Sequence, residues 1–214
     1  MSRARLSQLA GLYPLADDDP RWRHGPRAVL AGALAGGATV LQLRLKHSTD
    51  RESLELARWA AQQARAAGAL LIVNDRFDLA DLAGADGVHL GADDLAPERL
   101  PEALRARLVV GLSTHTLDQV RASRERPVDY IGFGPLFSSS SKESDYSARG
   151  IEMLRQAVAA AGRPVVAIGG ITGQNLEDVA RAGAAAAAVI SAIANAVDPA
   201  AETTRLAAVF AAAR

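Results

Sequence analysis

Three polar side chains at alternate positions form the first candidate site. Gln42, Arg44 and Lys46 alternate with leucine in the segment LQLRLK. If this segment is extended, the three side chains point to the same side, because successive side chains of a strand alternate between its two faces. An amide and two cations on one side predict a site that binds one anion.

Carboxylates follow two further apolar segments. Asn74 and Asp75 end the segment LLIVND, and Asp93 and Asp94 lie in GADD. The chain has no cysteine and no pair of histidines at metal-binding spacing. Oxygen ligands from two separate loops suit Mg²⁺, which usually takes one or two carboxylates and completes its shell with water and phosphate. The pattern predicts a magnesium site for a diphosphate.

A second group of segments favours phosphate. Gly169 and Gly170 in AIGGITGQN would allow backbone N–H groups to approach a phosphate closely, and Ser191 in VISAI opens an expected helix. The loop SSSSK brings Lys142, and hydroxyls beside a cation suit a phosphate lid. We therefore expect two facing anion sites, one rich in cations and carboxylates and the other rich in glycine.

Eight short apolar runs must position these residues. They span residues 12–15, 39–43, 70–73, 87–90, 108–112, 130–133, 165–168 and 187–190. Helical patterns separate most of them and are weakest in the gaps after the third and fourth runs. Alternating strands and helices imply right-handed crossovers to a parallel sheet. In 214 residues, eight such units predict one (β/α)8 TIM barrel that occupies the whole chain, residues 1–214. An open doubly wound sheet is the alternative.

The composition narrows the class of partner. The 24 basic and 24 acidic residues balance, without a long run of either sign, which argues against nucleic acid and anionic membranes as partners. No segment approaches the ~18 apolar residues of a membrane span. The absence of cysteine fits a reducing compartment. We expect a cytoplasmic protein that binds small molecules, and a homo-oligomer remains possible.

The polar segments resemble those of the thiamine-phosphate synthase family. The family pattern runs Q-x-R-x-K, V-N-D, G-x-H-x-G-Q-x-D, G-x-S-x-H, G-P-x-x-P-T-x-T-K, I-G-G-I and I-S-A-I. The matching segments are Gln42 to Lys46, Val73 to Asp75, Gly87 to Asp94, Gly111 to His115, Gly134 to Lys142, Ile168 to Ile171 and Ile190 to Ile193. Seven blocks in the family's order extend the resemblance over nearly the whole chain.

The resemblance implies a role for each matching residue. A pyrimidine diphosphate would be bound by Gln42, Arg44, Lys46, Asn74, Ser113 and Lys142. Mg²⁺ would be held by Asp75 and Asp94. A thiazole phosphate would be bound by Ser139, Ser141, Gly170, Ile190 and Ser191. The implied reaction is an ionisation in which diphosphate leaves, a pyrimidine-methyl cation forms and the thiazole nitrogen attacks it. Arg44, Lys46 and Lys142 would neutralise the charge on the departing diphosphate.

The chain departs from the family pattern at two places. Ala92 stands where the family usually has glutamine, and serines occupy positions 138–141 where Pro-Thr-x-Thr is usual. Serine keeps the hydroxyl group, whereas the loss of proline frees the backbone. Two alternatives therefore stay open. One is a thiazole tautomerase-like enzyme with the same barrel and phosphate site, and the other is a non-catalytic paralogue that only binds thiazole or thiamine phosphate.

Several of these residues also have simpler interpretations. Asp75 could cap the helix that follows it, and Asp94 is preferred to its neighbour as a ligand only through the resemblance. His89 is expected to be an interior histidine with satisfied ring nitrogens. Trp22 and Trp59 are expected to pack on helix faces.

Overall fold

Eight parallel strands close into a barrel. The computed structural model describes residues 3–138 and 147–214. The strands are β1 (Gly11–Asp17), β2 (Val40–Arg44), β3 (Leu70–Asn74), β4 (Gly87–Leu90), β5 (Val109–Thr114), β6 (Tyr130–Phe133), β7 (Val165–Ile168) and β8 (Ala186–Val189). Each strand pairs with the next, and β8 returns to pair with β1 in the register Gly11 with Ala186. The predicted barrel is confirmed, and the open sheet is wrong because neither end of the sheet has a free edge.

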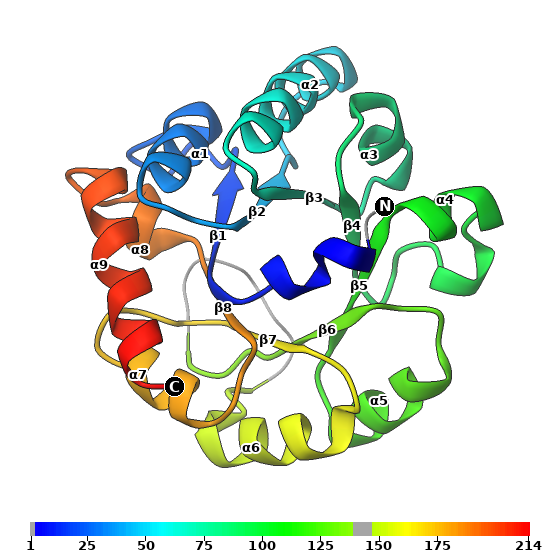
Figure 1. Cartoon of the computed structure of the whole chain (residues 1–214), viewed down its shortest axis with the longest axis vertical. Coiled ribbons are helices and arrows are strands. Elements are labelled where there is room, and N and C mark those ends of the chain that lie inside the picture. The colour runs from blue at the N-terminus through cyan, green and yellow to red at the C-terminus, as the bar shows by residue number, and fades with distance from the viewer. Residues whose placement is uncertain (1–2, 139–146) are drawn as a thin grey trace.

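Helices form a ring around the strands (Figure 1). The α-helices are α1 (Pro26–Ala35), α2 (Asp50–Ala66), α3 (Phe77–Ala83), α4 (Glu102–Arg107), α5 (Leu117–Ala122), α6 (Gly150–Ala161), α7 (Leu176–Arg181), α8 (Ser191–Ala194) and α9 (Pro199–Ala212). Short 3₁₀ helices are η1 (Arg3–Gln8), η2 (Pro97–Arg99) and η3 (Ser123–Glu125). The α-helices after β3 and β4 are short, with seven and six residues. None of the helices described is long and apolar enough to cross a membrane.

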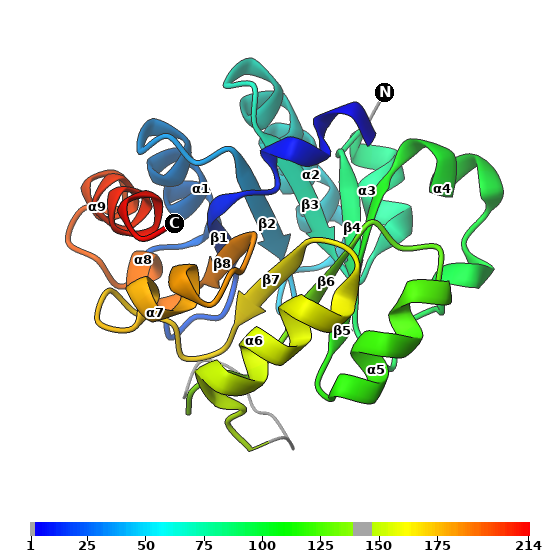
Figure 2. The same ribbon diagram turned by 60° about the horizontal axis from the view of Figure 1, so that its bottom comes forward.

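The two ends of the barrel differ. The strand arrows in Figure 2 run away from η1, which lies across the end where the strands begin. Leu6 in η1 and Leu9 just after it pack against the interior of the barrel. The opposite end, where the strands finish, is the end at which (β/α)8 barrels place their chemistry.

Alternation along the strands sorts side chains into two layers. Val40, Leu70, Ile72, Val109 and Val166 belong to one buried cluster inside the barrel, together with Tyr13 and Tyr130. Their strand neighbours belong to a larger cluster between the barrel and its helices. Continuing the period of two toward the strand ends places Gln42, Asn74, His89 and Ser113 on the inner side. The alternation that places apolar side chains in the core therefore also directs these polar side chains into the mouth of the barrel.

Candidate active site

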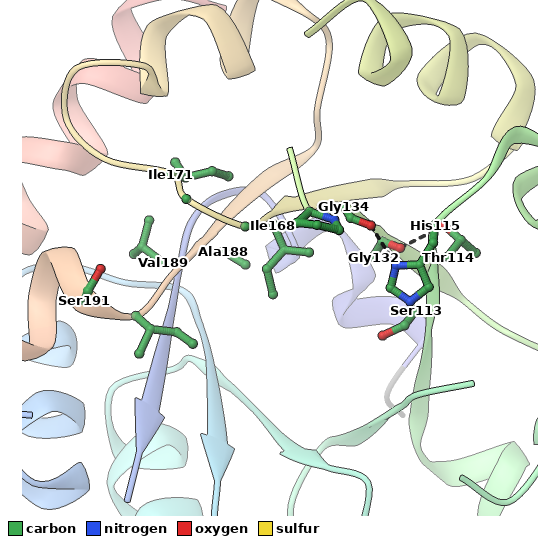
Figure 3. Close-up of a pocket in the computed structure, with 14 residues that line it drawn as sticks. Ser113, Thr114, His115, Gly132, Gly134, Ile168, Ile171, Ala188, Val189 and Ser191 are labelled. Carbon is green, nitrogen blue, oxygen red and sulfur yellow. Dashed lines mark hydrogen bonds between the residues drawn. The ribbon is translucent and has the colours of Figure 1, made fainter. Parts of the chain in front are cut away.

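Two cavities lie side by side at the ends of the strands. The first is lined by Gln42, Arg44, Asn74, Asp75 and His89, among others. The second contains Gly170, Ile171, Val189 and Ser191 (Figure 3). Both cavities are lined by Ser113, Gly132, Ile168, Ala188 and Ile190. Of the residues predicted for the pyrimidine diphosphate, the first cavity has Gln42, Arg44, Asn74 and Ser113 in its wall, whereas Lys46 lines neither cavity. Of those predicted for the thiazole phosphate, the second cavity has Gly170, Ile190 and Ser191.

Arg44 is held by a buried carboxylate. Its Nη1 atom lies 2.5 Å from Oδ2 of Asp17, and Asp17 is only 1% exposed. The other oxygen of Asp17 accepts from Trp22 Nε1 at 2.9 Å. Trp22 precedes α1 in a turn, so its predicted place on a helix face is wrong, and its indole serves as a hydrogen-bond donor. Trp59 does lie on α2, with the Arg27 guanidinium 4.7 Å from its ring centroid.

Asp18 fixes the loop that carries Lys46. Its carboxylate accepts hydrogen bonds of 2.7 to 3.0 Å from the backbone N–H groups of Lys46, His47 and Ser48 and from the Ser48 hydroxyl. Burial alone would raise the pKa of Asp18, but these donors outweigh it and hold the pKa below its usual value. Asp17 therefore positions Arg44 at the end of β2, and Asp18 positions the segment with Lys46 just after it. Sequence reasoning missed both, although Tyr13, Leu15 and Asp17 share the period of the inner face.

The carboxyl groups of Asp75 and Asp94 meet between the loops after β3 and β4. They lie within hydrogen-bonding reach of each other. Lys46 Nζ forms an ion pair with Asp75, and Gly91 N donates to Asp94 at 2.6 Å. Asp75 adopts φ of 61° and does not cap α3, since no side chain caps that helix. Asp93 is exposed.

The electrostatics of this pair favour a bound cation. Burial raises the pKa of Asp94, and the neighbouring Asp75 carboxylate raises it further. Burial would also raise the pKa of Asp75, but contacts with Asp94 and Lys46 outweigh it and lower that pKa. Two adjacent carboxyl groups that resist joint ionisation fit a hard divalent ion, which neutralises both. Within residues 3–138 and 147–214 no cluster of three or more metal-binding side chains occurs, so Mg²⁺ here would complete its shell with water and phosphate.

Hydrogen bonds cross the barrel interior beneath the first cavity. Gln42 Nε2 donates to the Tyr13 hydroxyl at 3.0 Å, and the Tyr13 and Tyr130 hydroxyls lie 3.2 Å apart. His89 contacts the Tyr130 hydroxyl through Nδ1 and Ser113 Oγ through Nε2, both at 3.0 Å. The prediction of an interior histidine with satisfied ring nitrogens is confirmed. The two tyrosines were not identified from the sequence.

The glycine-rich side brings backbone close to the second cavity. Gly169 and Gly170 have φ of 99° and 64°, a region that favours glycine. A Cβ atom on Gly170 would lie 2.7 Å from the carbonyl oxygen of Ser138. Ser191 begins the single turn of α8 and faces the cavity opposite Ser113 and His115 (Figure 3). His115, which had no predicted role, contacts the Gly134 carbonyl oxygen through Nδ1 at 2.7 Å.

Some predicted residues lie outside the described part of the chain. Ser139, Ser141 and Lys142 fall in residues 139–146, so their predicted roles remain predictions. Ala92, the departure from the family's usual glutamine, is exposed beside Asp93.

The closed parallel barrel with a polar mouth at its carboxyl end defines a (β/α)8-barrel enzyme. Comparison with known proteins identifies the family within this class. A family model described as thiamine monophosphate synthase matches residues 12–193. The chain belongs to this family, and the protein is an enzyme of the transferase class.

Individual relatives agree with the family match. The chain is 42% identical to the thiamine-phosphate synthase of Anaeromyxobacter dehalogenans, over 100% of this chain and 94% of that protein. It is 40% identical to that of Chloroflexus aurantiacus, over 91% and 90% of the two chains. The solved thiamine phosphate pyrophosphorylase from Pyrococcus furiosus has a TM-score of 0.87 and 34% identity, covering 97% of this chain and 98% of its own. The resemblance predicted from the motifs is confirmed.

Proposed function

We propose that this protein condenses 4-amino-2-methyl-5-(diphosphooxymethyl)pyrimidine with 4-methyl-5-(2-phosphooxyethyl)thiazole to give thiamine phosphate and diphosphate. The observation that carries the proposal is the common wall of the two cavities. One cavity offers Arg44 and the Asp75 carboxylate, and the other offers the glycine-rich turn and Ser191. A reaction that joins two phosphorylated rings needs two such spaces with their ring ends adjacent.

The chemical step breaks the bond between the pyrimidine methylene carbon and the diphosphate oxygen, and both electrons leave with the diphosphate. The lone pair of the thiazole nitrogen then forms the new carbon–nitrogen bond. No proton is transferred, so the step needs no general base. The protein must stabilise negative charge that grows on the leaving group and must hold the thiazole in line.

The residues in the wall of the first cavity and on the loops beside it suit this charge. Arg44, held by Asp17, and Lys46, held on its loop by Asp18, would meet the diphosphate as preorganised cations. Asp75 and Asp94 would hold Mg²⁺, which when bound supplies positive charge to the diphosphate oxygens. Asn74, next to Asp75 in the cavity wall, would donate an additional hydrogen bond. Gly170 and Ser191 would bind the phosphate of the thiazole.

The lysine content of the chain supports two of these assignments. Its 24 basic residues include only two lysines, Lys46 and Lys142, and arginine occupies every other basic position. A chain that otherwise uses arginine has kept the compact ammonium group at two positions that the family pattern assigns to the diphosphate. We therefore propose that Lys142, with Ser139 and Ser141, completes the site from the segment 139–146.

Turnover with each substrate alone and with both together tests the proposal. Thiamine phosphate and diphosphate should form only when both substrates and Mg²⁺ are present. A change of the thiazole phosphate alone would indicate a tautomerase instead. Binding of either substrate without turnover of the pair would indicate a non-catalytic paralogue. The paired carboxyl groups and the Arg44 ion pair favour the condensation, because neither alternative needs a diphosphate site.

A further inference from the structure

Five residues form a hydrogen-bonded chain through the barrel interior, which we name the polar relay: Gln42, Tyr13, Tyr130, His89 and Ser113. Both phenol rings are fully buried, and burial raises the pKa of each hydroxyl far above neutrality. Each tyrosine therefore keeps its one proton and can donate one hydrogen bond. Gln42 and Ser113, at the two ends of the relay, both line the first cavity.

The hydrogen bonds of the relay can all run in one direction, away from the Gln42 amide. In this direction Gln42 Nε2 donates to Tyr13, and the Tyr13 hydroxyl donates to Tyr130. Tyr130 then donates to Nδ1 of His89, which places the ring proton of His89 on Nε2. That proton goes to Ser113 Oγ, and the Ser113 hydroxyl keeps its own proton for a further bond.

Two other arrangements are self-consistent. In one, Gln42 Nε2 and the Tyr130 hydroxyl both donate to the Tyr13 oxygen, which can accept twice, and the His89 proton lies on Nδ1. In the other, the whole relay runs in the opposite direction. If the Gln42 carbonyl oxygen accepted from Tyr13, each bond would reverse, and the His89 proton would lie on Nδ1. Ser113 would then donate to His89 and could only accept from a ligand. The two directions thus differ in one observable property, the tautomer of His89.

In the direction that runs from Gln42 to Ser113, the two ends present unlike groups to the cavity. No donor among the described residues reaches the Gln42 carbonyl oxygen, which is left as an acceptor, while Ser113 offers a donor. A 4-aminopyrimidine needs this pair, because its amino group donates and its adjacent ring nitrogen accepts. A 4-oxopyrimidine carries the reverse pattern, with an oxygen that accepts and a ring N–H that donates.

We infer that the polar relay fixes one acceptor at Gln42 and one donor at Ser113, and so selects a 4-aminopyrimidine over a 4-oxopyrimidine. Tyr13, Tyr130 and His89 act as positioning residues, since they set the two ends of the relay. The inference deepens the proposed function and rests on it for the identity of the ligand. The direction of the relay is a property of the protein alone.

Two glycines make room for the relay. An added Cβ on Gly111 would lie 2.1 Å from Cζ of Tyr130 and 2.5 Å from Nδ1 of His89, and one on Gly132 would lie 3.1 Å from Cε1 of His89. The inner face of the barrel thus omits two side chains where it holds the His89 and Tyr130 rings. Such close packing leaves the rings little freedom to reorient, so the contacts of Tyr130 and His89 in the relay persist before a ligand arrives.

Nitrogen NMR of the ligand-free protein labelled with ¹⁵N-histidine tests the direction. The chain has four histidines, and single replacement of His24, His47 and His115 assigns the remaining signals to His89. The expected result is a His89 ring protonated at Nε2 only. Tyr130→Phe, which removes a single oxygen, should lower the fraction of that tautomer. A ring protonated at Nδ1, or at both nitrogens, would overturn the inference whatever the protein's function proves to be.

Calorimetry with the pyrimidine diphosphate and its 4-oxo analogue tests the selection. Wild type should bind the 4-amino compound more tightly. Tyr130→Phe should weaken that binding about two- to tenfold, the effect of one hydrogen bond, and should narrow the preference between the two compounds. Tyr13→Phe serves as the second variant if Tyr130→Phe does not fold. In the assay both should raise KM for the pyrimidine more than they lower kcat.

Thr203→Val is the matched control. It removes a buried hydroxyl that donates to the Pro199 carbonyl oxygen in α9, so it also costs one internal hydrogen bond but leaves the relay intact. Thr203→Val should keep the wild-type tautomer of His89 and the wild-type preference for the 4-amino compound over the 4-oxo compound. Equal preference for the two compounds in wild type would refute the selection. Failure of wild type to bind either compound would count against the proposed function, while the tautomer would still decide the direction.

Discussion

Asp17 and Arg44 form an ion pair between the ends of two adjacent strands, with Oδ2 and Nη1 2.5 Å apart. The carboxylate is buried and also accepts from the Trp22 indole, so it can hold the guanidinium in one orientation. Arginine binds a diphosphate through a fixed planar array of donors, and its orientation therefore affects binding. The pair links a residue with no predicted role to the proposed binding of substrate.

Asp17→Asn should weaken substrate binding and stability together. The asparagine amide keeps the shape of the carboxylate but loses the charge that orients Arg44. KM for the pyrimidine diphosphate should therefore rise roughly three- to tenfold. The free energy of unfolding should fall by about 1–3 kcal/mol. Steady-state kinetics and urea denaturation measure the two effects. Asp19→Asn is the control, because Asp19 pairs with the exposed Arg21 and should leave KM unchanged. Equal changes of KM in both variants would show that Asp17 does not act through Arg44.

Asp75→Asn and Asp94→Asn should each raise the Mg²⁺ concentration needed for half-maximal activity, because an amide supplies oxygen without charge. Wild-type activity should disappear in chelator and return with added Mg²⁺. Asp93→Asn shares the loop and the local charge, but its side chain is exposed and should have little effect. If Asp93→Asn were as damaging as Asp94→Asn, the assignment of Asp94 rather than Asp93 as the metal ligand would be wrong. Normal Mg²⁺ dependence in all three variants would refute the proposed metal site.

The carboxyl pair also predicts how stability depends on pH without metal. The pKa of Asp94 is raised from its ordinary value of 3.8, so protonated Asp94 favours folding, and this contribution is lost as the pH rises through its raised pKa. Asn resembles the protonated carboxyl, so Asp94→Asn should be more stable than wild type at neutral pH in chelator. The difference should vanish at low pH. Chemical denaturation at several pH values measures it, and a variant less stable than wild type at neutral pH would contradict the assigned direction.

Gly170→Ala should damage the thiazole side selectively. The added methyl group would approach the Ser138 carbonyl oxygen to 2.7 Å, at a φ of 64° that side chains seldom adopt. Affinity for the thiazole phosphate should fall, while affinity for the pyrimidine diphosphate should change little. Gly37→Ala provides the control, since Gly37 has φ of 87° with open space around it. Calorimetry with each substrate compares the affinities of the two variants. Equal losses of affinity for both substrates in Gly170→Ala would indicate general damage to the protein instead.

The sequence predicted the barrel because its signals are local. Each strand of the barrel is an apolar run bounded by turn residues. The observed bounds of the strands lie within two residues of the predicted bounds. It also predicted which segments reach the barrel mouth, since Gln42, Asn74 and Ser113 continue the alternation of their strands. Carboxylates from the loops after β3 and β4 were expected at one rim because these strands are neighbours, whereas the choice of Asp94 over Asp93 came only from the resemblance.

The residues whose roles were not predicted from the sequence owe those roles to contacts between strands that are distant in the sequence. Tyr13 and Tyr130 are 117 positions apart, and each alone is an ordinary apolar core position with an unassigned hydroxyl. Asp17 lay outside the predicted strand, which stopped at Leu15, two residues before the real end of β1. Gly111 belonged to a recognised motif, but its physical reason, the space for Tyr130 and His89, appears only once the barrel is closed.

A crystal structure of the protein with thiamine phosphate, diphosphate and Mg²⁺ would test the central claim most directly. The diphosphate should lie beside Arg44 with the metal between Asp75 and Asp94, and the pyrimidine ring should contact Gln42 and Ser113. The thiazole should cross the common wall so that its phosphate reaches Gly170 and Ser191. Thiamine phosphate bound entirely within one cavity, or diphosphate bound away from Arg44, would contradict a condensation across that wall.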